Sequence, residues 1–229
     1  MQRFAIYFTP APESDLAQAA ATWLGRDIFN QGIYHLPEVH GLAKERVQAL
    51  LQSPRHYGFH ATLKPPFRLK PGCNAVMLEK RMETFAASES AFILPPLRIE
   101  LMSRFFCLRL EEPPELMAMA ANIVQAFDDL RQEPDAAELQ KRRAAGLSAN
   151  QEAMLQAWGY PYVLDEYRFH LTLTGRVQDQ TEQEVLAAEL AKRFPAPLLE
   201  RLPFDSLALF VEEDKKPLRA LARYPLRTT

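Results

Sequence analysis

The tetrapeptide His60-Ala61-Thr62-Leu63 recurs with one change as His170-Leu171-Thr172-Leu173. In each copy polar and apolar residues alternate, which is typical of a β-strand with one face in the core. The alternation predicts that the histidine and the threonine of a copy project to the same face of their strand. We call these segments the first and second His-Thr strands, and we expect them to decide how the rest of the chain is arranged.

The similarity between the two halves extends beyond the tetrapeptides. Each His-Thr strand is followed by the same expected order of one helix and two strands. The matching strand segments are residues 97–102 with 207–212, at the same offset as the histidines, and 105–110 with 217–222, at an offset two residues longer. The sequence therefore predicts an internal duplication, with a first unit at about residues 55–112 and a second at about 165–226.

Short strands that occur in pairs and are separated by single helices predict an α+β fold with mostly antiparallel sheets flanked by helices. We expect residues 1–229 to form a single domain of two pseudo-symmetric lobes, with the His-Thr strands on either side of a central groove. Between the units, residues 131–160 are rich in Ala, Glu, Gln, Lys and Arg and predict a helical insert. We interpret its basic run, Lys141-Arg142-Arg143, as the solvated face of an amphipathic helix.

The remaining helices are predicted from periodicity and from proline and capping residues. They are expected at residues 14–26, 38–52, 74–88, 115–130 and 181–194. Ser53-Pro54 is expected to end the second of them, because the residue before a proline is biased away from the helical conformation. Residues 57–64 are then expected to form the first His-Thr strand.

Composition narrows the classes of function. The chain has 48% hydrophobic and 24% charged residues, as in an ordinary globular protein. Its net charge of −2 disfavours tight binding to long nucleic acid, although short oligonucleotides and small anions remain compatible with it. No apolar run approaches the roughly 20 residues of a membrane span. With only Cys73 and Cys107 as cysteines, we expect a cytoplasmic protein that is not embedded in a membrane.

Two imidazoles and two hydroxyls that face one groove can carry out acid–base chemistry on a phosphate. The unperturbed pKa of histidine lies near 6.5, so one ring can accept a proton while the other donates one. Threonine hydroxyls can hydrogen-bond the non-bridging oxygens of the phosphate. The candidate catalytic residues are therefore His60, His170, Thr62 and Thr172.

Further side chains near the two motifs could complete an anion pocket. Lys64 and Thr174 continue the polar faces of their strands, and Tyr57 and Arg176 lie close in sequence. We expect neither a metal ion nor an organic cofactor. His56 and His60 would lie roughly 13 Å apart in an extended strand, and the 8 glycines form no phosphate-binding loop.

The residues around both motifs resemble the two-histidine phosphoesterase superfamily, whose mark is a pair of His-x-Thr/Ser motifs in a duplicated α+β fold. Residues 57–67, 158–162 and 168–175 are similar to a branch of uncharacterised bacterial proteins associated with phosphonate metabolism. The resemblance implies a bilobal fold with a central groove and metal-independent attack on a phosphodiester. One histidine would activate water or a ribose hydroxyl, and the other would protonate the leaving oxygen.

Three functions are open at this point. The first is hydrolysis of a small cyclic or linear phosphodiester, as by a 2′,3′-cyclic phosphodiesterase; the association with phosphonate breakdown suggests a ribose-phosphate intermediate. The second is RNA-end processing or 2′–5′ RNA ligation, as in other branches of the superfamily. The third is a non-catalytic sensor that binds an anionic ligand in the groove. Which histidine is the base and which the acid stays open.

Overall fold

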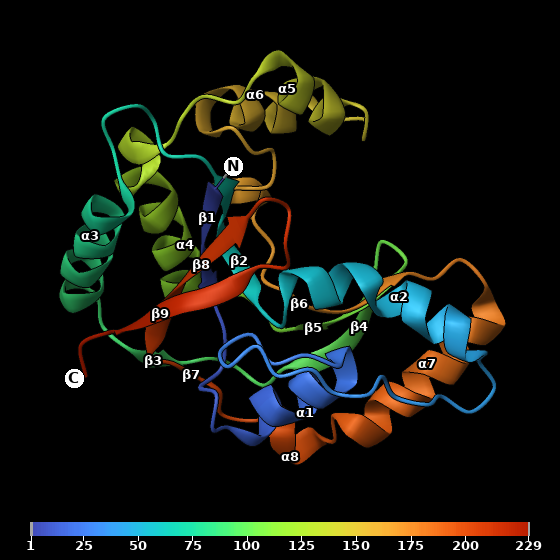
Figure 1. The fold of residues 1–229 in the computed structure, drawn as a ribbon. Helices are drawn as coiled ribbons and strands as arrows, with labels where there is room; N and C mark the ends of the chain where they lie inside the picture. Colours follow the sequence, from blue (N-terminus) through green and yellow to red (C-terminus); the bar gives the residue numbers. More distant parts are fainter. Residues whose placement is uncertain (1, 229) are drawn as a thin grey trace.

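The computed structural model describes residues 2–228 (Figure 1). The strands are β1 (Gln2–Phe8), β2 (Ala61–Phe67), β3 (Phe92–Ile93), β4 (Arg98–Met102), β5 (Phe105–Arg109), β6 (Leu171–Arg176), β7 (Pro203–Phe204), β8 (Ser206–Glu213) and β9 (Arg219–Pro225). The helices are α1 (Asp15–Leu24), α2 (Lys44–Tyr57), α3 (Ala75–Ser88), α4 (Pro114–Ala126), α5 (Ala136–Arg143), α6 (Ala149–Trp158), α7 (Gln180–Arg193) and α8 (Ala196–Leu199). Short 3-10 helices lie at Asp128–Leu130 and Leu164–Glu166.

Two sheets carry the two His-Thr strands. The larger has the strand order β2-β1-β8-β9, and the smaller has the order β4-β5-β6. A two-stranded ladder joins β3 to β7. All of these strand pairs are antiparallel. The predicted α+β class with mostly antiparallel sheets flanked by helices is confirmed.

Each of the two main sheets contains strands from both predicted sequence units. Strand β2, from the first unit, lies in the sheet that contains β8 and β9 of the second unit. Strand β6, from the second unit, pairs with β5, which pairs with β4 of the first. Each unit thus contributes its His-Thr strand to the sheet that holds the other unit's strand pair, so both sheets need the whole chain.

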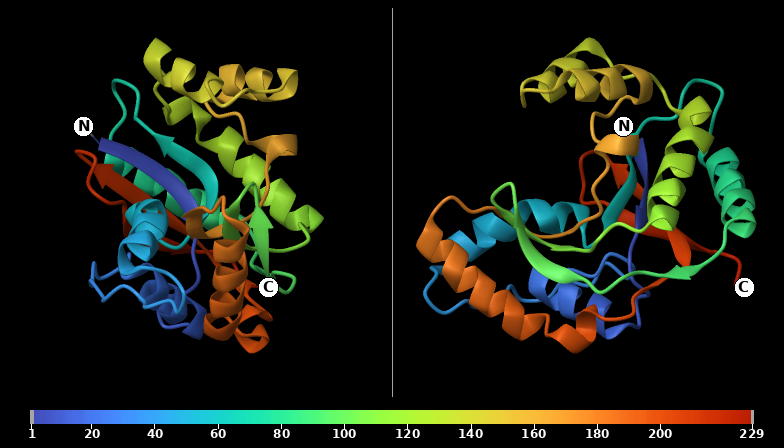
Figure 2. Two further views of the ribbon diagram at one scale, coloured as in Figure 1. Left: turned by 90° about the vertical axis from the view of Figure 1, so that its right-hand side faces the viewer. Right: turned by 180° about the vertical axis from the view of Figure 1, so that it is seen from behind.

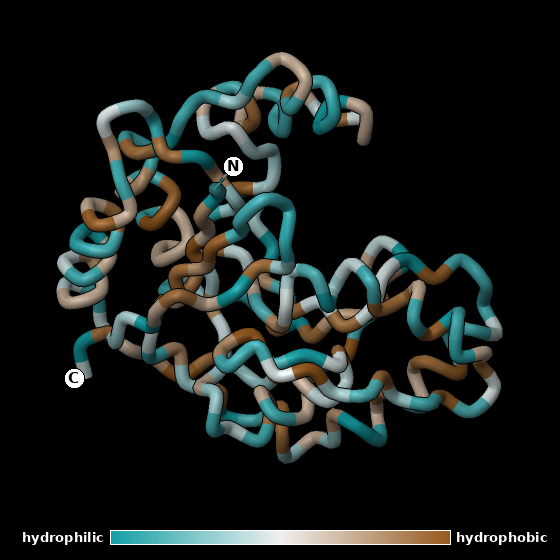
Figure 3. Tube along the Cα trace, viewed as in Figure 1, coloured by the Kyte–Doolittle hydropathy of each residue, from teal (hydrophilic) through white to brown (hydrophobic). Residues whose placement is uncertain are grey.

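The helices divide between the two sheets. In Figure 2, α3 and α4 cover one face of the larger sheet, and α1, α2 and α7 pack against the smaller one. Alternation along β1 sends Phe4, Ile6 and Phe8 into the main core, whereas Tyr7 faces the other way, against Phe210. The insert helices α5 and α6 stand apart from this core, and much of α5 is hydrophilic (Figure 3). No helix within residues 2–228 is long and apolar enough to cross a membrane.

Helix α2 continues through Pro54 and ends at Tyr57. The predictions that it ends at Ser53-Pro54 and that Tyr57 lies in a strand are therefore wrong. Proline lacks an N–H, so Pro54 leaves the carbonyl of Leu50 without its usual helical donor. Gly175 of β6 packs against this carbonyl; a Cβ at Gly175 would lie 3.0 Å from the Leu50 oxygen. The close packing of α2 on β6 therefore depends on both a proline and a glycine.

Gly58 makes the turn between α2 and β2. Its φ of 80° and ψ of 175° belong to a region that only glycine adopts readily. A Cβ at this position would also lie 2.1 Å from Cγ2 of the buried Ile28. The turn brings the chain from the end of the helix into the first His-Thr strand within three residues.

We expect Gly58→Ala to lower the free energy of unfolding by about 1–3 kcal/mol because the turn is strained by any side chain. Urea unfolding followed by tryptophan fluorescence measures the change. Gly72→Ala is the matched control, since Gly72 also has a positive φ, of 87°, but has open space around its Cβ position. Equal losses in the two variants would contradict a specific constraint at Gly58.

Candidate active site

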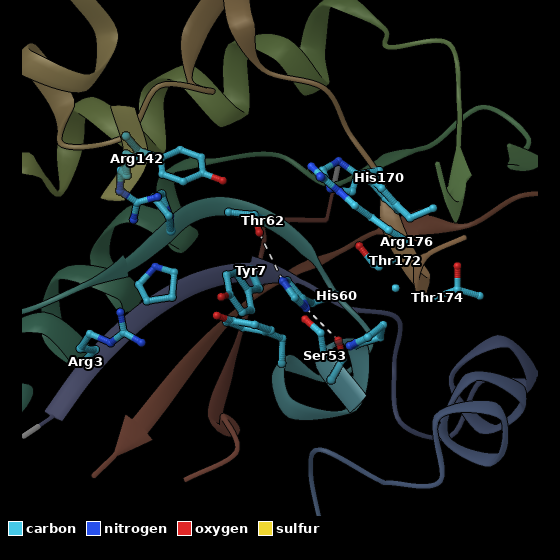
Figure 4. A pocket seen from close by; sticks show the side chains of 18 residues that line it. Arg3, Tyr7, Ser53, His60, Thr62, Arg142, His170, Thr172, Thr174 and Arg176 are labelled. Atoms are coloured by element: carbon cyan, nitrogen blue, oxygen red, sulfur yellow. Dashed lines mark hydrogen bonds between the residues drawn. The ribbon is translucent and has the colours of Figure 1, made fainter. Parts of the chain in front are cut away.

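A groove of about 510 Å³ is lined by both His-Thr strands (Figure 4). Every candidate residue predicted from the sequence lines it except Lys64: Tyr57, His60, Thr62, His170, Thr172, Thr174 and Arg176. The other lining residues come from β1, α2, the turn at Gly58, β2, β5, β6 and the insert. The structure therefore brings together residues that lie 110 positions apart in the chain.

The ring of His60 is held in one orientation and one tautomer. Its Nδ1 lies 2.8 Å from the carbonyl oxygen of Gly58. Because a carbonyl can only accept, Nδ1 carries the proton, and Nε2 has the free lone pair in the neutral ring. Nε2 lies 3.2 Å from the hydroxyl oxygen of Thr62. The ring stacks on Tyr7, with 3.8 Å between the ring centroids.

His170 is anchored in the same way. Its Nδ1 lies 2.8 Å from the carbonyl oxygen of Arg168, again two residues earlier in the chain. Its surroundings differ, since the ring is half-buried and its aromatic neighbour, Phe105, lies 5.8 Å away between ring centroids. Both histidines therefore leave Nε2 as the nitrogen available to a ligand in the groove.

Burial favours the neutral form of both histidines. It lowers the pKa of His60 from 6.5 to about 4, against the opposing effect of the hydrogen bond to Gly58, and the charge of His170 lowers this pKa further. Burial also lowers the pKa of His170, where the hydrogen bond to Arg168 opposes the shift. For His170 the charge of Arg109 lowers the pKa and that of Glu112 raises it. A carboxylate thus supports protonation of His170, and no carboxylate does so for His60 in the described chain.

The second His-Thr strand offers one hydroxyl and one cation to the groove. Thr174 is fully buried, and its hydroxyl accepts a hydrogen bond of 2.9 Å from the backbone N–H of Phe106. This bond fills an irregularity in the register between β5 and β6. Thr172 is half-buried, and Arg176 is exposed at the end of the strand, with no carboxylate partner in residues 2–228. Thr172 and Arg176 are therefore freer than Thr174 to bind a ligand.

The prediction that Lys64 shares the groove face with His60 is wrong. Along β1 and β2, Tyr7 pairs with Thr62, but Ile6 pairs with Lys64. One step on β1 thus matches two on β2, so the strand bulges at Leu63 and the alternation of its side chains is reversed. Lys64 is turned into the protein, with 2% of its surface exposed.

Lys64 instead caps the end of helix α4. Its Nζ donates to the carbonyl oxygen of Val124 at 2.9 Å and lies 3.3 Å from a carboxylate oxygen of Asp128. Carbonyls in the last turn of a helix lack partners within the helix, and a cation there is favourable. Burial lowers the pKa of Lys64 to about 8, although Asp128 opposes the shift. The role of Lys64 is structural.

We expect Lys64→Met to lower the free energy of unfolding by about 1–3 kcal/mol, because the carbonyl of Val124 loses its donor. The activity of the folded protein should be unchanged. Arg176→Met is the matched control, because it removes the same charge from an exposed position in the groove. This variant should weaken activity without a comparable loss of stability. Urea unfolding and steady-state kinetics separate the two effects. Loss of activity with unchanged stability in Lys64→Met would contradict this structural role.

Several groove residues were not found from the sequence. They are Arg3, Tyr7, Ser53, Phe105, Arg142 and Tyr160. Arg142 was interpreted as part of a solvated face, but its guanidinium lies over the ring of Tyr160, 4.6 Å from the ring centroid, and lines the groove. The aromatic run Gly159-Tyr160-Pro161-Tyr162, at the end of the insert, is the signal that could have indicated this return to the site.

His56 lies in α2 and not in a strand, so the strand separation expected between His56 and His60 does not apply. The Nε2 atom of His56 lies 3.2 Å from a carboxylate oxygen of Glu212, which is buried. Within residues 2–228, no group of three or more His, Cys, Asp or Glu side chains is placed to hold a metal ion.

Comparison with known proteins gives the family of the chain. Residues 62–219 match a family described as "Protein of unknown function (DUF1045)". The chain belongs to this family. It is also similar to two curated proteins named ribose 1,5-bisphosphate phosphokinase PhnN. The protein of Janthinobacterium sp. (strain Marseille) is 42% identical over 175 residues, which are 76% of this chain and 39% of that protein.

The second relative, from Laribacter hongkongensis (strain HLHK9), is 33% identical over 214 residues, which are 93% of this chain and 48% of that protein. The chain thus spans less than half the length of these two relatives. Among solved structures, it is similar to Escherichia coli LigT complexed with 3′-AMP, at 14% identity and a TM-score of 0.42 over 98% of both chains. Usb1 of Kluyveromyces marxianus with uridine monophosphate gives 13% identity and a TM-score of 0.38, also over 98% of both chains.

The lowered pKa of His60 makes the stability of the protein depend on pH. In the unfolded chain this histidine binds a proton near pH 6.5, but in the folded protein it does so only near pH 4. The unfolded state therefore binds more protons between these values, and stability falls as the pH falls through this window. The loss from His60 at pH 4 is on the order of 3 kcal/mol.

Urea unfolding at pH 7 and at pH 4 measures this dependence. We expect His60→Asn to lose less stability on acidification than the wild type, because asparagine does not titrate. His40→Asn, at an exposed position outside the groove, should keep the wild-type dependence. An unchanged dependence in His60→Asn would show that His60 is not the group that titrates.

Proposed function

We propose that the protein hydrolyses a small phosphodiester, with His60 as the base and His170 as the acid. The observation that carries this proposal is the common anchoring of the two rings. Each Nδ1 donates to a backbone carbonyl at 2.8 Å, and each ring lines the same groove. Two imidazoles anchored through Nδ1 present Nε2 to the groove, where an unprotonated Nε2 can take a proton and a protonated one can give a proton.

In this mechanism the phosphate lies between the two rings. The hydroxyls of Thr62 and Thr172 donate to its non-bridging oxygens, and Arg176 balances the charge that grows on them. One histidine takes a proton from water as the water oxygen attacks phosphorus. The other, protonated on Nε2 as well as on Nδ1 when substrate binds, gives its Nε2 proton to the leaving oxygen as the bond from that oxygen to phosphorus breaks. The products are a phosphate monoester and a free hydroxyl group, and the exchange of the two protons with solvent restores the rings.

We assign the base to His60 and the acid to His170. His60 is the more buried ring and has its pKa lowered to about 4, so it is unprotonated at neutral pH. His170 has Glu112 nearby, whose charge raises the pKa of the imidazole. Glu112 is held in place by Arg109 at 2.7 Å and by the N–H of Phe169 at 3.2 Å. The negative charge of a bound phosphate raises the pKa of both rings toward neutrality, where acid–base catalysis is efficient.

The curated relatives suggest the class of substrate. Their name says that they act on ribose 1,5-bisphosphate, and this chain matches part of their length. Hydrolysis of the 1,2-cyclic phosphate of ribose 5-phosphate, with cleavage at the 2-oxygen, would produce ribose 1,5-bisphosphate. We therefore propose a cyclic phosphodiester of ribose 5-phosphate as the substrate, which also fits the association of the resembling branch with phosphonate breakdown.

The test is a screen of phosphodiesters with the wild type and with His60→Asn and His170→Asn. Candidate substrates are the 1,2-cyclic phosphate of ribose 5-phosphate, 2′,3′-cyclic AMP and bis(p-nitrophenyl) phosphate. We expect each variant to lower kcat by about 10²–10⁴-fold, because each removes one proton-transfer group. His40→Asn is the matched control and should keep wild-type activity. Product formation is followed by ³¹P NMR.

Two outcomes would contradict the proposal. Turnover that survives in both histidine variants would exclude them as the acid and the base. Tight binding of these compounds by calorimetry, with no product after long incubation, would favour a sensor of anionic ligands.

A further inference from the structure

The groove holds more hydrogen-bond donors than one phosphodiester can use. Besides the His-Thr strands, it is lined by a second set of side chains that we call the distal cluster: Arg3, Tyr7, Tyr57, Arg142 and Tyr160. Figure 4 places Arg3 and Arg142 on one side of His60, and His170 and Arg176 on the other. The two arginines of the distal cluster therefore lie beyond the reacting centre.

Arg142 carries a charge that the protein does not neutralise. In the described part of the chain Arg142 makes no ion pair with a carboxylate, and its guanidinium carbon lies 4.6 Å from the centroid of the Tyr160 ring. Stacking on an aromatic ring fixes the plane of a guanidinium but leaves its N–H groups free. A half-buried arginine of this kind is suited to an anion from solution.

Arg3 is oriented rather than free. Its Nε donates to a carboxylate oxygen of Glu212 at 2.6 Å, and its Nη2 pairs with the same oxygen. Glu212 is itself held by His56 at 3.2 Å. The remaining nitrogen, Nη1, has no acceptor in residues 2–228, so Arg3 can still donate to a ligand in the groove.

The three tyrosines add neutral donors. Burial raises the pKa of Tyr7, and the nearby phenols of Tyr57 and Tyr160 raise it further, so its hydroxyl keeps its proton. Burial likewise raises the pKa of Tyr160. Only 1% of the surface of Tyr7 is exposed, and its hydroxyl has no hydrogen-bond partner within the described residues. A phenol hydroxyl that lines a groove and lacks a protein partner is available to a ligand.

The position of the distal cluster fits a group separate from the reacting phosphate. Tyr7 lies directly under His60, and Arg3 is four residues away on the same face of β1. Four residues of extended strand span roughly 13 Å between Cα atoms. This length leaves space for a sugar between the His-Thr strands and the guanidinium of Arg3.

We propose that the distal cluster binds a terminal phosphate monoester, so that the substrate is a phosphodiester that carries a second, separate phosphate. This inference rests on the proposed function. Guanidinium groups match the geometry of phosphate oxygens, and phenol hydroxyls supply further donors to a dianion. A substrate with a neutral hydroxyl in this place would leave Arg142 without a counter-charge.

The proposal gives the insert a role in specificity. Arg142 belongs to α5, and Tyr160 follows α6, so one of the two arginines and one of the phenols come from the segment between the predicted units. The insert therefore selects substrates by the presence of a terminal phosphate, while the His-Thr strands carry out the reaction on the phosphodiester.

The experiment compares the 1,2-cyclic phosphate of ribose with and without a 5-phosphate. We expect Arg142→Ala to lower kcat/KM for the 5-phosphorylated compound by about 10- to 100-fold, the effect of one charge-assisted hydrogen bond. Its kcat/KM for the compound without the 5-phosphate should be unchanged. Arg142→Lys should recover part of the loss. Lys141→Ala, an equal change of charge at an exposed position on the same helix, should behave as the wild type.

The outcomes separate this inference from the proposed function. Wild-type turnover of both compounds with equal kcat/KM, or an equal loss on both in Arg142→Ala, would overturn the terminal-phosphate subsite and leave the phosphodiesterase standing. Absence of wild-type turnover would overturn the proposed function. Calorimetry with ribose 5-phosphate then tests the subsite alone: weaker binding to Arg142→Ala than to Lys141→Ala supports it, and equal binding overturns it.

Discussion

The hydrogen bond from each histidine Nδ1 to the carbonyl two residues earlier is the interaction on which the site depends. It fixes the tautomer of both rings and leaves Nε2 to the groove. For His60 the acceptor belongs to Gly58, whose turn follows the end of α2. Arg26 holds that helix end, because its guanidinium donates to the carbonyls of Arg55 and His56 at 3.0 and 3.1 Å. Burial of this arginine lowers its pKa, but arginine remains charged at neutral pH. A cation some distance from the groove thus positions the backbone that orients the ring.

The exchange of strands between the two sheets places the histidines in one groove. Each His-Thr strand is hydrogen-bonded into a sheet with strands from the other half of the chain. Antiparallel ladders fix the register of a strand to a single residue, since a slip of one residue would move its apolar side chains to the opposite face. The register of both His-Thr strands therefore depends on segments far away in sequence. The same ladders that stabilise the fold also align the two imidazoles.

Two departures from regular structure decide which polar residues reach a ligand. The bulge at Leu63 turns Lys64 away from the groove and into the protein. There Lys64 caps the end of α4. The insert has the opposite effect, because its polar helix α5 places Arg142 in the groove beside Tyr160. A regular strand would have added a lysine to the site, and a fully solvated insert would have left Arg142 in bulk water. The charge available to a substrate is therefore a consequence of backbone geometry and not of composition alone.

The sequence by itself determined the α+β class, most of the helices and the pairing of His60 with His170, because alternation and repetition are local patterns that side-chain chemistry imposes. It also indicated that Thr62 and Thr172 face the groove, since both lie before any irregularity in their strands. Only the tertiary structure decided the position of Lys64, because a bulge is set by the partner strand β1. It likewise decided that Arg3, Tyr7 and Arg142 join the site. Their neighbours in the groove lie far away along the chain, and no local pattern records which distant segments pack together.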